Sequence, residues 1–149
     1  LNTLWPEFRA ALPQAILRRL GLQPHDVERD GAFVASLFAF LGTSQVPYEQ
    51  FFFDWRGGAL GAERAARSPS ASAYASEAFR PLADALEDFT PAANLNLDHA
   101  YFSRTQPRTM LVDDVEAIWA PIAERDDWSV FHQALAEIAQ MRAAYGVLP

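Results

Sequence analysis

The chain has 149 residues, 50% of them hydrophobic, and a formal net charge of −7, a size and balance typical of one globular domain. It contains no cysteine and all twelve of its basic residues are arginine, which excludes disulfides, a thiolate nucleophile, a cysteine zinc site, a Schiff-base lysine and a kinase-type ATP lysine. Its acidity makes nucleic acid an unfavourable partner, and no apolar run approaches the ~18 residues that a membrane span needs.

The chain begins with Leu1 instead of methionine, and no basic-then-apolar targeting segment opens it. We therefore expect a piece of a longer protein, located in the cytoplasm. Segments suited to helices alternate with proline and glycine, and no run shows the period-2 alternation of a half-buried strand. The sequence predicts an all-α fold, residues 1–149 forming one domain of about seven to eight short helices in an irregular array.

Two helices are expected in the first third of the chain. Pro13 suits the first turn of a helix that ends at Leu20, before Gly21 as a left-handed cap residue. Asp30 is expected to cap the next helix, which ends at Gly42. That helix carries Phe33, Val34, Leu37, Phe38, Phe40 and Leu41. Its wide apolar face predicts the most buried helix of the domain.

An aromatic segment follows, in which Pro47 begins a short helix that the pair Gly57-Gly58 stops. A helix cannot bury all of its rings on one narrow face. Burial by the domain's own helices is the first interpretation, and a docking surface for a partner is the second. The candidate docking residues are Tyr48, Phe51, Phe52, Phe53, Trp55 and Arg56.

The next expected helical region runs from 71 to 89, after a start at Ser68-Pro69, and Pro81 is expected to kink or split it. Residues 90–106 show no periodicity and predict an irregular segment. This segment is expected to lie against the core through Leu95, Leu97, Tyr101 and Phe102.

Two amphipathic helices complete the domain. Pro107 is expected to open the first, with an apolar stripe of Met110, Leu111, Val115, Ile118, Trp119 and Ile122. Asp126 or Asp127 is expected to cap the second, which Gly146 ends. Its inward face is predicted to carry Phe131, Leu135, Ile138, Met141 and Tyr145.

No motif in the sequence predicts chemistry. The histidines His25, His99 and His132 lack any metal-ligand spacing, and the adjacent Asp113 and Asp114 point about 100° apart on a helix. A phosphate or carboxylate site is conceivable at Arg56, Arg64 and Arg67, but solvated charges or ion pairs with Glu63 and Asp54 are favoured. We therefore predict no catalytic, cofactor-binding or metal-binding residue in this chain.

Two stretches carry a resemblance to a known family: LRRLGLQPHDVERDGAFVASLFAFLGTSQVPYEQFFFDWRGG at 17–58 and PRTMLVDDVEAIWAPIAERDDWSVFHQALAEI at 107–138. They resemble the C-terminal helical region of the selenoprotein O family, the YdiU-like protein adenylyltransferases. The chain departs from that family where it has LVDD instead of a LRN-like sequence, and it lacks the terminal cysteine or selenocysteine of some members.

The resemblance implies an N-terminal kinase-like domain that binds ATP and magnesium and transfers AMP to hydroxyl side chains of protein substrates. Because this chain has no lysine, it cannot supply the ATP-binding lysine of such a domain. The resemblance thus implies an accessory helical domain, whose partners are the kinase-like domain of the parent chain and the parent's substrates. The alternatives are a self-sufficient helical binding module and, third, a hydrolase that uses His99 or His132 with a carboxylate. A detached accessory domain is expected to expose an apolar face around residues 48–55, whereas a complete module is expected to bury those rings.

Overall fold

The computed structural model describes the backbone of residues 4–146 and the side chains of residues 11–146. This part of the chain forms eight α-helices and two short 3₁₀ helices and contains no strand beyond one isolated bridge between Leu22 and Pro91, which confirms the predicted all-α fold. The α-helices are α1 (Leu4–Leu20), α2 (Val27–Ser44), α3 (Tyr48–Asp54), α4 (Ala62–Ala66), α5 (Ala71–Tyr74), α6 (Arg80–Asp88), α7 (Val112–Arg125) and α8 (Ser129–Ala144). The 3₁₀ helices are η1 (Gly58–Gly61) and η2 (Ala100–Ser103).

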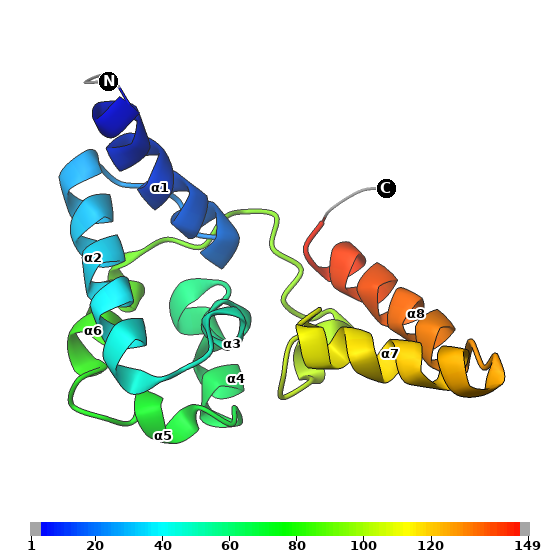
Figure 1. The fold of residues 1–149 in the computed structure, drawn as a ribbon. Coiled ribbons are helices and arrows are strands. Elements are labelled where there is room, and N and C mark those ends of the chain that lie inside the picture. The colour runs from blue at the N-terminus through cyan, green and yellow to red at the C-terminus, as the bar shows by residue number, and fades with distance from the viewer. Residues whose placement is uncertain (1–3, 147–149) are drawn as a thin grey trace.

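The helices fall into two groups, which Figure 1 shows side by side. Helices α1–α6, here called the helical body, pack around one apolar core, with α2 contacting both α1 and α6. Helices α7 and α8, here called the C-terminal hairpin, pack on each other, and α8 also contacts η2. A long irregular segment between α6 and α7 joins the two groups (Figure 1).

Helix α1 ends as expected but begins earlier than the sequence suggested. Pro13 lies inside α1 and not in its first turn. At the other end Gly21 has a φ of 70°, and the Leu22 N–H donates to the Leu17 carbonyl at 2.8 Å. This left-handed glycine with a hydrogen bond reaching back five residues is the Schellman C-cap, which satisfies carbonyls at the helix end.

Helix α2 has a different cap from the expected one. Asp26 occupies the N-cap and accepts a hydrogen bond from the Arg29 N–H at 2.9 Å. Asp30, the expected cap, lies one turn inside the helix, where its carboxylate accepts from the His25 N–H at 3.1 Å. The helix also continues past Gly42 to Ser44, and Gln45 is its C-cap residue. The sequence predicted a cap here but not its register, because two aspartates four residues apart both accept from backbone N–H groups at the start of the helix, Asp26 from Arg29 and Asp30 from His25.

The stretch between α3 and α6 is more broken than expected. Helix α3 follows Pro47, and the left-handed Gly57 and Gly58 reverse the chain after it. The sequence did not indicate η1 or α4. The expected split of 71–89 is confirmed, since α5 and α6 are separate, but Pro81 lies in the first turn of α6. It therefore begins a helix, where its missing N–H is not needed, and kinks none.

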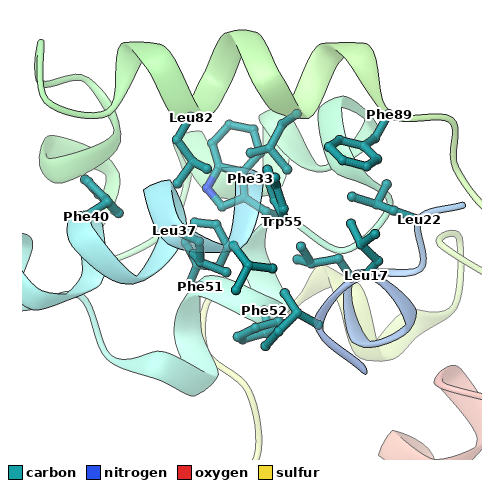
Figure 2. Packing of buried hydrophobic residues seen from close by; sticks show 14 of the residues in the cluster. Leu17, Leu22, Phe33, Leu37, Phe40, Phe51, Phe52, Trp55, Leu82 and Phe89 are labelled. Carbon is teal, nitrogen blue, oxygen red and sulfur yellow. The ribbon is translucent and has the colours of Figure 1, made fainter. Parts of the chain in front are cut away.

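The core of the helical body is aromatic and aliphatic. Figure 2 shows Phe51, Phe52 and Trp55 from α3 and its end packed among residues from α1, α2 and α6. The irregular segment 90–106 contacts the helical body where Leu95 lies close to Gly21 and Leu97 close to Gly57, whereas Tyr101 and Phe102 pack in a separate, smaller cluster. A methyl group on Gly57 would lie 2.7 Å from the Leu97 side chain, and the φ of 84° at Gly57 is left-handed, so this position favours glycine.

The C-terminal hairpin corrects two predicted faces. Helix α7 begins at Val112, not Pro107, and four residues of its predicted inward stripe are exposed: Met110, Leu111, Val115 and Trp119. On α8, Leu135 is exposed, whereas the other predicted inward residues are half-buried: Phe131, Ile138, Met141 and Tyr145. The reason is that each helix of a two-helix hairpin has one neighbour, which covers less than a wide apolar face.

The turn between α7 and α8 uses both aspartates. Asp126 is left-handed, with a φ of 55°, and ends α7. The Asp127 carboxylate accepts from the Ser129 N–H at 3.0 Å, although the N-cap position of α8 itself is Trp128. The left-handed Gly146 follows the end of α8, as expected.

Candidate functional site

The aromatic segment is buried within the chain. Phe51, Phe52, Phe53 and Trp55 are all buried, and Tyr48 alone keeps 38% of its surface exposed. The structure therefore matches the first interpretation, burial by the domain's own elements, and corrects the expectation that these rings form a docking surface.

Two separate clusters make this burial possible. Phe51, Phe52 and Trp55 belong to the core of the helical body. Phe53 points to a second, smaller cluster, where Tyr101 and Phe102 of η2 meet Ala144 of α8. Because α3 lies between two groups of side chains, a helix of seven residues buries rings on opposite faces.

The two buried arginines, Arg56 and Arg64, link separate segments through hydrogen bonds to backbone carbonyls. Arg56 donates to the Arg19 carbonyl at 2.8 Å and lies over the Tyr145 ring at 4.3 Å. Arg64 donates to the carbonyls of Phe53 and Arg56, both at 2.7 Å. Burial lowers the pKa of both guanidinium groups from their ordinary value. The favoured ion pairs with Glu63 and Asp54 do not form within the described part, because backbone carbonyls and rings occupy these arginines, whereas Arg67 is exposed.

A buried polar network next to α3 escaped the sequence analysis. The fully buried carboxylate of Asp54 accepts hydrogen bonds from the Gln50 side chain at 2.8 Å and from the Tyr74 hydroxyl at 2.9 Å. Gln50 also donates to the Thr105 carbonyl at 3.0 Å. Burial raises the pKa of Asp54, against the opposing effect of these hydrogen bonds. The available signal was the spacing of Gln50 and Asp54, two polar residues one helical turn apart within an aromatic run.

The dispersed histidines have structural contacts. The His99 Nδ1 accepts from the Tyr101 N–H at 3.1 Å and so caps η2, while the rings of His25 and His132 lie against Phe89 and Phe131. Asp114 accepts from the Thr109 hydroxyl at 2.7 Å and the Leu111 N–H at 3.0 Å. Within residues 4–146, no three histidine or carboxylate side chains are grouped closely enough to hold a metal ion.

The exposed apolar surface lies on α7, not on α3. Val112, Val115 and Trp119 follow one another at helical spacing, and Val112 and Trp119 expose 72% and 61% of their surface. Leu111 and Met110 extend this surface at the N-terminal end of the helix. We call these five residues the α7 face. A contiguous exposed apolar surface of this kind marks interaction sites in soluble proteins.

A pocket of about 480 Å³ opens between the helical body and the C-terminal hairpin. Its walls come from the end of α1, from α3, from η2, from residues 107–111 and from the last turns of α8. Sequence reasoning missed this pocket because its residues come from five segments that no local pattern connects. Its volume lies in the range of small-molecule sites.

Comparison with protein-family models identifies the family of this chain. The model of one protein family, described as protein adenylyltransferase SelO, matches residues 1–139. Comparisons with curated proteins and with solved structures found no significant match. A further observation concerns membranes: within residues 4–146, no helix combines the length and apolar composition that crossing a bilayer requires.

Proposed function

Because this chain belongs to the family of the protein adenylyltransferase SelO, we propose that it works as a helical accessory domain of such an enzyme. In this proposal a kinase-like domain of the same parent binds ATP and magnesium and transfers AMP to hydroxyl side chains of protein substrates. The present chain supplies packing and access for substrates, in the cytoplasm. Its lack of lysine supports this division, since a kinase-type nucleotide site uses one.

The observation that carries the proposal is the α7 face. Val112, Val115 and Trp119 lie outward on a helix whose other side already packs on α8. Covering each such side chain stabilises an association by on the order of 2 kcal/mol. We infer that the kinase-like domain covers this face in the parent protein.

The charges around the α7 face specify the chemistry of that contact. Glu116 follows Val112 by four residues and precedes Trp119 by three, so it borders the stripe on the same side of the helix. Asp113 is also exposed, and neither carboxylate forms an ion pair with another described residue. The complementary surface of the kinase-like domain is therefore apolar with basic side chains beside it.

The experiment combines this chain with the separately expressed kinase-like domain and measures their association and the transfer of labelled AMP from ATP to protein. We expect binding that Trp119→Gln together with Val115→Gln weakens at least tenfold, as loss of about two buried apolar side chains implies. Leu135→Gln serves as the matched control, because Leu135 is equally apolar and exposed but lies on α8. No association, or equal loss in the control, would contradict the proposal.

A second candidate function is a self-sufficient helical module that binds a ligand without catalysis. Two observations favour it: the aromatic segment is buried, and the chain has a pocket of its own. Light scattering separates the two functions. A complete module stays monodisperse at high concentration, whereas a detached domain self-associates through the α7 face and becomes monodisperse in the Trp119→Gln, Val115→Gln variant.

A further inference from the structure

The pocket between the helical body and the C-terminal hairpin combines apolar walls with three guanidinium groups. Arginines 19, 108 and 142 line it, and among the described residues Glu49 is its one carboxylate. Glu49 is already paired with Arg19. This accumulation of guanidinium groups is notable in a chain whose net charge is −7.

Arg108 is a half-buried guanidinium with a donor that has no partner in the described part of the chain. Its side chain is only 18% exposed, yet among the described residues it donates no hydrogen bond, and its Nε is buried without a partner. Its nearest carboxylate oxygen, on Glu137, is 3.4 Å away, and Arg104 shares that oxygen at 3.7 Å. Asp114 is a further carboxylate in its neighbourhood.

A guanidinium with little exposure and unmade hydrogen bonds carries a desolvation cost. An anion in the pocket would offer acceptors to the accessible donors of this guanidinium, and a planar carboxylate or a phosphate matches their fork. The apolar walls favour a ligand that also has an apolar part. The chain's two methionines, Met110 and Met141, both belong to these walls.

We propose that this pocket binds a small organic anion, whose carboxylate or phosphate contacts the Arg108 guanidinium and whose apolar body packs against Met110 and Met141. This inference goes beyond the accessory role. The pocket shares Met110 and Leu111 with the α7 face, whereas Val112, Val115 and Trp119 do not line it.

The two methionines allow a direct test. With methyl-labelled methionine, the 149-residue chain gives two signals, and both report on this pocket. We titrate the chain with phenylpropanoate, phenethyl phosphate, inorganic phosphate and phenylpropylamine. Both organic anions are expected to shift both signals saturably, inorganic phosphate more weakly, and the amine not at all. The head group that binds more tightly identifies the preferred anion.

Variants decide whether Arg108 is the contact. Arg108→Gln is expected to weaken anion binding about tenfold or more, since a charge-assisted hydrogen bond is lost. Arg80→Gln is the control, because Arg80 pairs with Glu77 on the surface and does not line the pocket. If Arg108→Gln lowers the melting temperature so far that the chain unfolds, Arg19→Gln replaces it, with an expected loss of about threefold.

Three results would overturn the proposal. The first is the absence of any saturable methyl shift with either organic anion. The second is an equal shift with phenylpropylamine, which would show an apolar site that is indifferent to charge. The third is unchanged anion affinity in folded Arg108→Gln and Arg19→Gln, which would place the anion elsewhere.

Discussion

The helical body and the C-terminal hairpin carry similar apolar patterns and bury them to different extents. In the body, α1, α2, α3 and α6 surround a core in which Leu20, Leu37, Phe51 and Leu86 have almost no exposed surface. In α7 and α8, the fully buried side chains are small, Ala134, Ala144 and Pro121, while Trp119 and Leu135 face solvent. Apolar periodicity therefore specifies a face of a helix, and the number of neighbouring helices decides whether that face is covered.

The connection between the two regions depends on few side chains. Tyr145, just after α8, stacks on Arg56 and lies against the rings of Tyr101 and Phe102. The Arg104 and Arg108 pairs with Glu137 add charge contacts on the other side of α8. We expect the hairpin to open locally at a lower free energy than the body, as regions with little buried apolar contact do.

The largest expected effect breaks the core of the body. Phe51→Ala is expected to lower the free energy of unfolding by about 3–5 kcal/mol, because it leaves a cavity in the centre of a packed cluster. Leu135→Ala, at a position with 48% exposure in the hairpin, is expected to change it by less than about 0.5 kcal/mol. Urea unfolding followed by circular dichroism measures both. Similar losses would show that the two regions are equally packed.

An intermediate effect on stability is expected at the contact between the helical body and the C-terminal hairpin. Tyr145→Ala removes the ring that contacts Arg56 and η2, and is expected to destabilise the hairpin by about 2 kcal/mol. Hydrogen exchange is expected to speed up in α7 and α8 and to stay unchanged in α2. Tyr145→Phe keeps the ring and is expected to behave like the original chain. Faster exchange throughout α2 would mean that the regions unfold as one unit.

The smallest expected effect concerns how stability depends on pH. Asp54 in the body and Asp114 in the hairpin are expected to change it in opposite directions. Burial raises the pKa of Asp54 in the body, so its contribution to stability is present below the ordinary value of 3.8 and is lost as the pH rises through the raised value. Hydrogen bonds from Thr109 and Leu111 lower the pKa of Asp114 in the hairpin. Its contribution is therefore present above 3.8 and is lost as the pH falls through the lowered value.

Single substitutions separate these two responses. Relative to Asp54→Asn, the original chain is expected to lose stability as the pH rises above 3.8. Relative to Asp114→Asn, it is expected to lose stability as the pH falls below about 4. Urea unfolding at a series of pH values checks both signs. If the original chain instead becomes more stable relative to Asp54→Asn as the pH rises, the raised pKa assigned to Asp54 is wrong.

Local signals predicted most of the elements and some of their ends. Gly21 and Gly146 end α1 and α8 because a left-handed residue is required there and glycine adopts it without cost. Helix starts with several polar residues nearby were harder to predict. Asp26 and Asp30 are an example, since both carboxylates accept from backbone N–H groups near the start of α2. Helix α4 is only five residues long, and this is too short for an apolar periodicity to predict a helix.

The candidate sites depended on contacts between distant segments. The sequence indicated that Phe51, Phe52 and Phe53 were unusual, but not which elements would cover them. Their burial requires η2 on one side and α1 and α2 on the other. The orphaned Nε of Arg108 likewise has no local signature, because it results from where Glu137 and Tyr101 lie.

The sequence by itself determined that the fold is helical, that two long stretches resemble one protein family, and that lysine and cysteine chemistry is absent. These properties follow from composition and local spacing. Only the tertiary structure decided that the aromatic segment is core and that α7 faces outward. Burial depends on how many elements surround a side chain, and distant segments supply those elements. The same holds for the arginine-lined pocket, whose five walls meet only in the folded chain.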